Sequence, residues 1–197
     1  MKTKAVVTVL GLASTVLALP AAAQMSMSSA YIGGGLGQSK FKDGCSGLSG
    51  LGVSCDDSDT SFKIFGGYQF NRYIAAELGY NDLGKAKVTG PGGTDEFKAT
   101  AWELSAVGSW PVMDQLAVFG RLGAYYGEGK ISGPDNGEKK TTNLTFGAGA
   151  QYDFTRNFGV RIEWQRFSKI KFHNDVVGVD AEGDVDVLGA SVLYRFQ

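Results

Sequence analysis

Apolar and polar residues alternate along most of the chain beyond residue 29 with a period of two. The clearest stretch is Phe65–Gly84, in which two alternating runs flank Asn71-Arg72. In the second run, alternate residues from Ile74 to Tyr80 are apolar, whereas the opposite face carries Glu77 and glycine. A period of two is that of a β-strand, so this stretch predicts a hairpin. Its apolar face fits lipid outside, and the other face fits a narrow polar interior.

The same alternation predicts eight strands. They cover residues 30–41, 61–70, 73–84, 97–110, 115–130, 141–154, 158–171 and 184–196. Long polar segments at 42–60, 85–96, 131–140 and 172–183 alternate with short turns, as in outer-membrane barrels. No stretch after residue 23 is apolar enough for a spanning helix, and only helices and closed barrels satisfy their backbone groups in lipid. We therefore predict an all-β fold, an eight-stranded antiparallel up-and-down transmembrane β-barrel.

The first 23 residues have the layout of a secretory signal. Lys2 and Lys4 precede an apolar run over residues 5–19, and Pro20 with three alanines follows. That run is short for a spanning helix, which needs about 20 residues. We expect cleavage before Gln24, which leaves a barrel domain over residues 24–197.

The charge of the expected mature chain argues against one class of partner. Without Lys2 and Lys4 the 19 basic residues fall to 17 against 20 acidic ones, a net charge of about −3. Nucleic-acid binding requires a basic stripe or patch, so we expect no nucleic-acid partner.

Both cysteines, Cys45 and Cys55, lie in one segment rich in glycine and serine. In an exported chain this predicts a disulfide that staples the first long loop. A metal or redox pair would need neighbouring His or Cys ligands, which the segment lacks. The acidic run at 56–59 lacks the spacing of an EF-hand and is interpreted as a solvated loop. We expect no metal and no cofactor.

Outward aromatic residues are expected to mark the edges of the apolar band. Trp102 and Trp110 are eight residues apart on one predicted strand, which suits a band about 25 Å tall. The predicted aromatic girdle consists of Tyr68, Tyr80, Trp102, Trp110, Tyr152, Trp164, Tyr194 and Phe196.

The predicted inward charges balance. They are Lys63, Arg121, Arg161 and Arg195 against Glu77, Glu103, Asp153 and Glu163. An eight-stranded barrel is just wide enough to be filled by its own side chains, and unpaired charges inside it are strongly unfavourable. We therefore expect a lumenal ion-pair network and an occluded lumen. A soluble ligand-binding barrel would have the opposite pattern, with an apolar interior.

Several motifs resemble the transmembrane barrel of the outer-membrane protein A family. They are Phe65-Gly-Gly-Tyr-Gln-Phe-Asn, Glu77-Leu-Gly-Tyr, Arg121-Leu-Gly, Arg161-Ile-Glu-Trp-Gln and Tyr194-Arg-Phe. The resemblance covers residues 30–196. It implies a barrel in the outer membrane of a Gram-negative bacterium, inserted by the barrel assembly machinery, in contact with membrane lipid and lipopolysaccharide. It also implies roles in envelope integrity and surface interaction.

Two departures from the family pattern change these expectations. Larger members continue into a periplasmic peptidoglycan-binding domain, whereas this sequence stops at Gln197, so we do not expect cell-wall tethering. In the family an inward glutamate and arginine form a lumenal gate with a lysine and a second acid. Glu77 and Arg161 match, but Val107 and Gln151 stand at the other two positions. We therefore expect Glu77 and Arg161 to form a fixed structural ion pair.

Three functional classes remain. The favoured one is a structural and interaction protein that serves envelope integrity, adhesion or partner binding through four extracellular loops, with a host or surface ligand. The alternative is a narrow pore, because the lumen is polar. An outer-membrane lipid-modifying enzyme is least favoured, because the only histidine, His173, lies in the fourth predicted loop. Outward Arg166 leaves two readings open: contact with lipopolysaccharide phosphates, or simple snorkelling to the interface.

Overall fold

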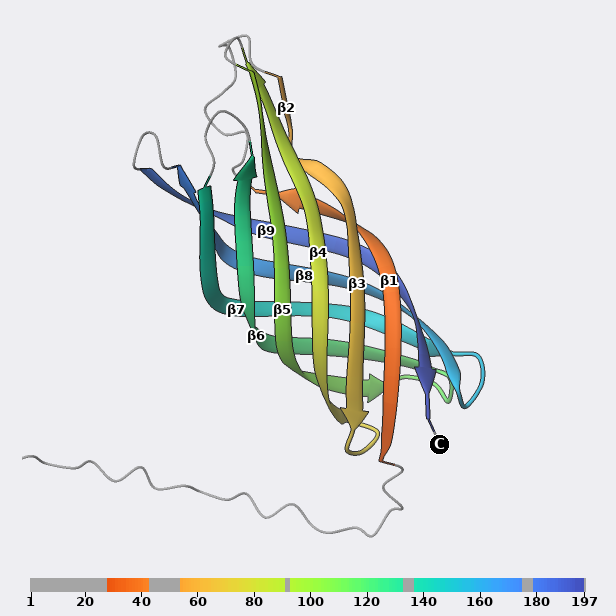
Figure 1. The fold of residues 1–197 in the computed structure, drawn as a ribbon. Helices are drawn as coiled ribbons and strands as arrows, with labels where there is room; N and C mark the ends of the chain where they lie inside the picture. The colour runs from red at the N-terminus through yellow and green to blue at the C-terminus, as the bar shows by residue number, and fades with distance from the viewer. Residues whose placement is uncertain (1–27, 43–53, 91–92, 133–136, 175–178, 197) are drawn as a thin grey trace, which may run out of the picture.

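The computed structural model describes residues 28–42, 54–90, 93–132, 137–174 and 179–196 (Figure 1). Within these ranges the chain is built from antiparallel strands. They are β1 (Ser29–Phe41), β2 (Ser54–Asp56), β3 (Ser58–Gln69), β4 (Ile74–Gly90), β5 (Gly93–Pro111), β6 (Leu116–Ser132), β7 (Gly137–Asp153), β8 (Phe158–Asn174) and β9 (Val179–Arg195). Among the described residues, no helix has the length and hydrophobicity needed to cross a membrane.

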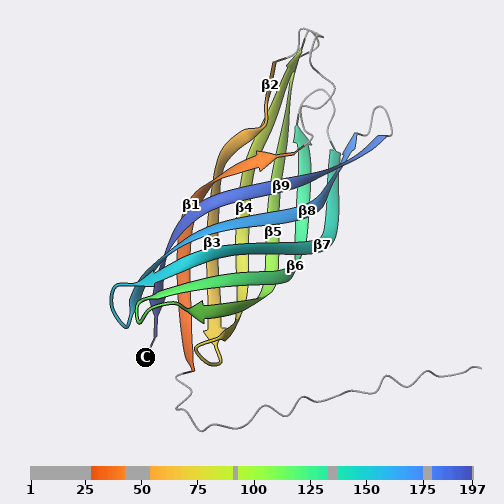
Figure 2. The same cartoon turned by 180° about the vertical axis from the view of Figure 1, so that it is seen from behind.

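Eight of these strands close into a barrel. Neighbours pair in the order β4-β3-β1-β9-β8-β7-β6-β5, and β4 pairs with β5 to close the ring. The closed ring is visible from both sides in Figures 1 and 2. The short β2 adds three residues to the far end of β4, beyond the ring. The predicted eight-stranded antiparallel up-and-down barrel is confirmed.

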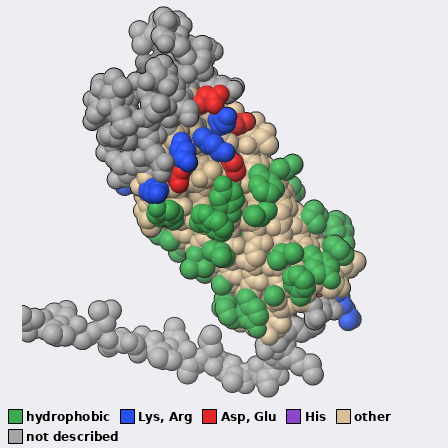
Figure 3. Space-filling view, in the orientation of Figure 1, with side chains coloured by type: hydrophobic (Ala, Val, Ile, Leu, Met, Phe, Trp, Pro, Cys, Tyr) green, Lys and Arg blue, Asp and Glu red, His purple; other side chains and the backbone are tan. Residues whose placement is uncertain are grey.

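Burial along the strands is inverted relative to a soluble protein. In β5, Trp102 and Leu104 are 55% and 63% exposed, whereas Glu103 between them is 1% exposed. Exposed apolar side chains occur on all eight strands of the ring and form an apolar belt, part of which is visible on the face shown in Figure 3, whereas polar side chains are buried in the middle of the barrel. This arrangement suits lipid on the outside and a narrow polar interior, which is why the alternating pattern predicts the strands correctly.

The strands at one end are longer than predicted. The β4–β5 ladder continues to Gly90 and Gly93, the β6–β7 ladder to Ile131 and Gly137, and the β8–β9 ladder to Asn174 and Val179. The predicted long loops at 85–96, 131–140 and 172–183 are therefore mostly strand, and that part of the prediction is wrong. The prediction relied on an outward apolar face, which ends at the edge of the membrane. The backbone ladder needs no such face and continues into water.

Two irregularities bend these extended hairpins. The β4–β5 register shifts between Asp82 and Lys85, where Gly84 has φ +77°, and the β8–β9 register shifts between Phe167 and Ile170. Such bulges increase local twist and redirect a strand. Figures 1 and 2 both show the ends of β4–β5 and β8–β9 diverging beyond the ring.

The barrel interior has three layers. An apolar cluster near the short turns consists of Tyr31, Phe65, Ala75, Val107, Phe119 and Leu193. Charged side chains occupy the middle. A second apolar cluster lies toward the hairpins and consists of Phe41, Leu83, Ala86, Ala99, Ala101, Tyr125, Phe167, Ile170 and Val185. The charged layer is therefore enclosed between two apolar plugs.

Candidate functional site

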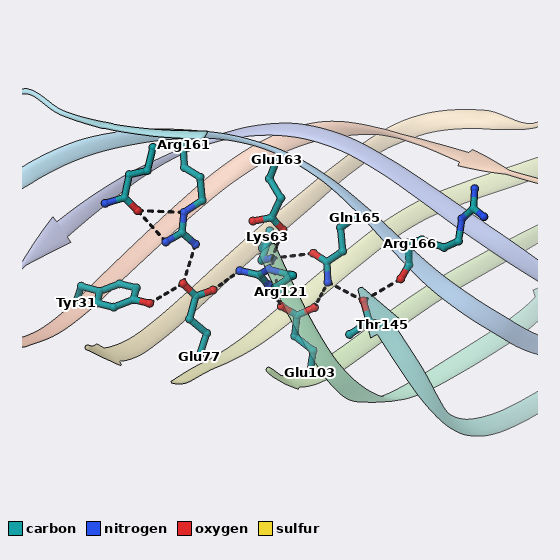
Figure 4. A network of polar contacts seen from close by, with 11 residues as sticks. Tyr31, Lys63, Glu77, Glu103, Arg121, Thr145, Arg161, Glu163, Gln165 and Arg166 are labelled. Carbon is teal, nitrogen blue, oxygen red and sulfur yellow. Dashed lines mark hydrogen bonds and ion pairs between the residues drawn. The ribbon is translucent and has the colours of Figure 1, made fainter. Parts of the chain in front are cut away.

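The middle layer holds six charged side chains that we call the central ion cluster. They come from β3, β4, β5, β6 and β8, each at an inward position of the strand alternation. The cluster consists of Lys63, Glu77, Glu103, Arg121, Arg161 and Glu163 (Figure 4). Three cations face three carboxylates, so the cluster is neutral.

Arg121 is the hub of the cluster. Its guanidinium pairs with Glu77 through Nη2 and with Glu103 through Nη1. Its Nε lies 3.3 Å from Oε1 of Glu163, an ion-pair contact without hydrogen-bond alignment. Arg121, Glu77 and Glu103 are each at most 4% exposed. In such a low-dielectric site, charges remain ionised only when they are paired.

Glu77 also pairs with Arg161, as expected from the sequence. Arg161 Nη1 lies 2.7 Å from Glu77 Oε1, and the Tyr31 hydroxyl donates a 2.6 Å hydrogen bond to the same oxygen. Gln151, which stands where the family pattern has an acid, accepts hydrogen bonds from Arg161 at 2.9 and 3.3 Å. The neutral Gln151 amide therefore accepts from Nε and Nη2 of Arg161, while Nη1 of the same guanidinium pairs with Glu77.

Lys63 joins the remaining two glutamates. Its Nζ lies 3.2 Å from Glu103 and 3.0 Å from Glu163, and it donates a 2.9 Å hydrogen bond to Gln165. The Gln165 amide donates in turn to Glu103 and, at 2.9 Å, to the Thr145 hydroxyl. Tyr31, Thr145 and Gln165 were not among the predicted members of the network, because that prediction included charged side chains only. Their inward position together with their polarity was the signal available.

Asp153 and Arg195 lie apart from the central ion cluster. They pair with each other at 3.4 Å near the short turns and are partly exposed. The Gln151 amide donates to Asp153 at 2.9 Å and thereby links this pair to Arg161. The structure thus brings six of the eight predicted lumenal charges into one cluster and connects the other two through a glutamine.

Little free space remains around the cluster. On the side of the short turns, the Arg161 guanidinium of the cluster lies 4.7 Å from the ring centre of Phe119 and 5.1 Å from that of Phe65. Above it, a cavity of about 30 Å³ is lined by residues that include Ser61 and Asn81, and it has room for about one or two water molecules. This interior suits a packed core.

The aromatic side chains predicted for the girdle face outward. Seven are 36–69% exposed, and Tyr80 lies against Trp102 at 5.1 Å between ring centres. Near the short turns, Trp110 contacts Tyr73 at 6.2 Å, and Tyr194 contacts Phe158 at 5.0 Å. Both edges of the apolar belt therefore carry rings that suit the interface between lipid and water.

Outward Arg166 has a partner that the sequence analysis missed. Its Nε and Nη2 donate to the two carboxylate oxygens of Asp186 at 2.6 and 2.8 Å, and Lys42 lies 3.3 Å from the same carboxylate. Asp186 lies above the apolar belt, and its pKa is lowered because Arg166 donates these hydrogen bonds to it. Arg166 and Asp186 are direct cross-strand neighbours, which only the β8–β9 register reveals.

Several sequence predictions fall outside the described residues. These are the signal peptide at 1–23 and Cys45; Cys55 is described only by its backbone in β2, so the disulfide stays a prediction. His173 is likewise described only by its backbone, near the end of β8. Among the described residues, no group of three or more His, Cys, Asp or Glu side chains is arranged to hold a metal ion.

Comparisons with known proteins agree with this architecture. Residues 26–197 match the model of the OmpA-like transmembrane domain. The chain is 33% identical over 177 residues to outer membrane protein A of Yersinia pseudotuberculosis and 32% identical over 171 residues to that of Klebsiella aerogenes. Each alignment covers 84% of this chain and 48% of the relative. The chain thus spans about half the length of these curated relatives.

Solved structures share the fold at low sequence identity. Neisserial surface protein A aligns with a TM-score of 0.61 and 15% identity, over 86% of this chain and 99% of that protein. Ail of Yersinia pestis, crystallised with the heparin analogue sucrose octasulfate, aligns with a TM-score of 0.53 and 18% identity, over the same shares. The closed ring, the inverted burial and the family match lead to one conclusion: the chain belongs to the OmpA-like transmembrane domain family and is a β-barrel of the outer membrane.

Proposed function

We propose that the barrel is a non-conducting structural protein that anchors rigid hairpins at the cell surface for envelope integrity and partner binding. The observation that carries this proposal is the closed interior, in which the neutral central ion cluster lies between two apolar plugs. Opening a path would require breaking buried ion pairs, which is strongly unfavourable.

The extended hairpins support the interaction part of the proposal. The β4–β5, β6–β7 and β8–β9 ladders continue beyond the belt, and the apolar cluster around Tyr125 and Phe167 fills the barrel beneath them. Such a packed base suits the display of the hairpins to a partner. Ail shares this fold and binds a heparin analogue in its crystals, so a polyanionic surface ligand is one partner class to test.

The maturation steps belong to the same proposal. The signal is removed before Gln24, the barrel assembly machinery inserts the mature chain, and a Cys45–Cys55 disulfide staples the first loop. Intact mass of the protein purified from outer membranes tests both covalent changes, with alkylation before and after reduction to count free thiols. A mass that includes residues 1–23, or two thiols that alkylate without reduction, would contradict them.

Conductance is the test of the closed interior. We expect purified barrel in planar bilayers to give no steady single-channel currents, because the central cluster fills the lumen. Glu103→Gln, which removes one carboxylate shared by Arg121 and Lys63, serves as the comparison variant. Steady currents from wild-type protein whose amplitude changes in this variant would favour the alternative, a narrow pore through the cluster.

We propose no enzymatic activity. The curated relatives are outer membrane proteins A, and no catalytic role is carried over from them. Hydrolysis or acyl transfer on lipid A that disappears in a His173→Ala variant would contradict this part of the proposal.

A further inference from the structure

We propose that the outer part of β8, residues 168–174, is an attachment site for an extended polypeptide segment of a partner protein, which adds to the β8–β9 hairpin as a third strand. We call the side of this stretch that faces away from β9 the β8 arm edge. The inference rests on the partner-binding part of the proposed function, and it names the site and the kind of partner.

The outer part of β8 has a ladder on one side only. The β7–β8 ladder ends at the pair of Thr145 with Phe167, whereas the β8–β9 ladder continues to Asn174 and Val179. Seven residues of β8, 168–174, therefore extend past β7. Within the described ranges, no strand pairs with β8 along this edge.

The β9 side of the same hairpin extends past its neighbour over a shorter stretch. The β1–β9 ladder ends at the pair of Phe41 with Val185, and one further bond runs from the Lys42 N–H to the Asp184 carbonyl at 2.8 Å. Beyond it, residues 179–183 of β9 have β8 as their one described ladder partner. The hairpin thus leaves the ring as a two-stranded ribbon, which is marginally stable in water and would be stabilised by a third strand.

The base of the ribbon is anchored in the barrel. Ile170 is 2% exposed and belongs to the apolar cluster toward the hairpins. Where β7 leaves β8, side-chain hydroxyls replace its hydrogen bonds. The Thr145 hydroxyl donates to the Arg166 carbonyl at 2.9 Å, and the Tyr125 hydroxyl donates to the Ser168 carbonyl at 2.6 Å. The positions at which a new strand could pair therefore lie beyond Ser168, on a fixed support.

Strand alternation identifies the backbone groups of the β8 arm edge. Successive residues of an antiparallel strand direct their N–H and C=O groups to opposite sides. The Asp184 carbonyl faces β1, so Glu182 and Asp180 of β9 also direct their backbone groups away from β8. Their cross-strand neighbours are Lys171 and His173, whose backbone groups therefore point away from β9. The edge thus presents donors and acceptors in one row, with a repeat of about 7 Å.

Such a row selects a polypeptide in the extended conformation. Its repeat matches the donors and acceptors of another β-strand, as in recognition by strand addition. The chain uses the same contact internally, because β2 adds Ser54–Asp56 to the edge of β4. Figures 1 and 2 show β2 beside the end of β4 and the β8–β9 hairpin projecting separately. We therefore assign the partner segment to β8, whose extension past its neighbour is the longer one.

The test measures water exchange of backbone amides by NMR in the isotope-labelled full chain, refolded in neutral nanodiscs. The probe is a short peptide of alternating threonine and valine, N-methylated at every second residue so that one edge alone can form a ladder. The control peptide has the same sequence but is N-methylated at every residue, so neither edge can donate. We expect the probe at saturation to slow exchange of the Lys171 and His173 amides about tenfold, because a ladder bond must open before its amide exchanges.

Two matched proline variants locate the site. Lys171→Pro removes an N–H from the β8 arm edge, and Glu182→Pro removes one from the directly opposite position on β9. Neither N–H belongs to the β8–β9 ladder, so the Ile170 and Phe172 amides should stay protected in both variants. Lys171→Pro should lose most of the probe binding, whereas Glu182→Pro should retain it. Lys171→Gln keeps the N–H while it removes the same charge, and it should bind like wild type.

Unchanged exchange at Lys171 and His173 in wild type, equal effects of the two peptides, or slowing at Asp180 and Glu182 instead would overturn the proposal. If Lys171→Pro unfolds the hairpin, the comparison of the two peptides on wild type still decides. The lumen is tested separately by conductance. Silent bilayers together with unchanged exchange would overturn this inference alone, whereas steady currents together with slowed exchange would contradict the closed interior and leave the inference standing.

Discussion

At the scale of single residues, strand parity predicts which side chains enter the lumen but not which of them meet. Parity puts Arg121, Glu103 and Glu77 inside, and the structure adds that one guanidinium serves three carboxylates. The ion-pair partners of an inward side chain depend on how five strands are staggered around the ring. The alternation along one strand carries no information about that stagger. For the same reason the pattern does not reveal Asp186 as the partner of Arg166.

Loss of the hub should destabilise the barrel more than loss of any peripheral charge. Arg121→Met leaves three buried glutamates with two cations, and we expect the free energy of unfolding in lipid vesicles to fall by about 3–5 kcal/mol. Arg195→Gln breaks a partly exposed pair and should change it by about 1 kcal/mol or less. Urea titrations followed by tryptophan fluorescence measure both. Equal effects would mean that the buried pairs contribute no more than the exposed one.

At the scale of elements, the alternation predicts the membrane-spanning part of every strand, because lipid on one side and a packed lumen on the other impose it. Above the belt that constraint ends. Residues 85–90 and 93–96 continue as strand through backbone pairing, with an ion pair between Lys85 and Glu96, whereas turn-forming residues such as Gly90 led to the prediction of a long loop. The bulges at Gly84 and Lys169 are equally invisible to a period-two pattern.

The β4 bulge gives a sharp test of this outer architecture. Gly84 has φ +77°, and a Cβ there would lie 2.8 Å from the Thr60 carbonyl oxygen, so Gly84→Ala should destabilise the barrel by about 1–3 kcal/mol. Gly108 faces outward, and a Cβ added there would have no atom within 4 Å, so Gly108→Ala should be neutral or slightly stabilising. Unfolding titrations of the two variants side by side decide the matter. A neutral Gly84→Ala would mean that the bulge can straighten without loss.

At the scale of the whole molecule, the β4–β5 ladder is what makes the fold a closed ring. Closure removes both sheet edges, and every backbone group in the lipid zone can then be paired. The sequence predicts this closure, since an exported chain with eight lipid-facing strands has no other way to satisfy its backbone in a membrane. It does not predict that the interior would separate into two apolar plugs and a charged middle.

Closure should be visible on detergent gels. Unheated protein from outer membranes should run as a compact, fast band that slows on boiling, because the ring survives the detergent at room temperature. Reductant should leave the fast band unchanged, since β4–β5 pairing and not a disulfide closes the barrel. A single band position before and after boiling, or protein recovered as a soluble periplasmic species, would contradict the membrane barrel.

The distribution of the central ion cluster along the chain has a consequence for biogenesis. Each hairpin formed around a short turn contributes one positive and one negative member: Lys63 and Glu77 from β3–β4, Glu103 and Arg121 from β5–β6, and Arg161 and Glu163 from β7–β8. Moving an isolated ion into hydrocarbon is far less favourable than moving a compensated pair. As far as the central ion cluster is concerned, the chain can therefore enter the bilayer in hairpin-sized, electroneutral increments.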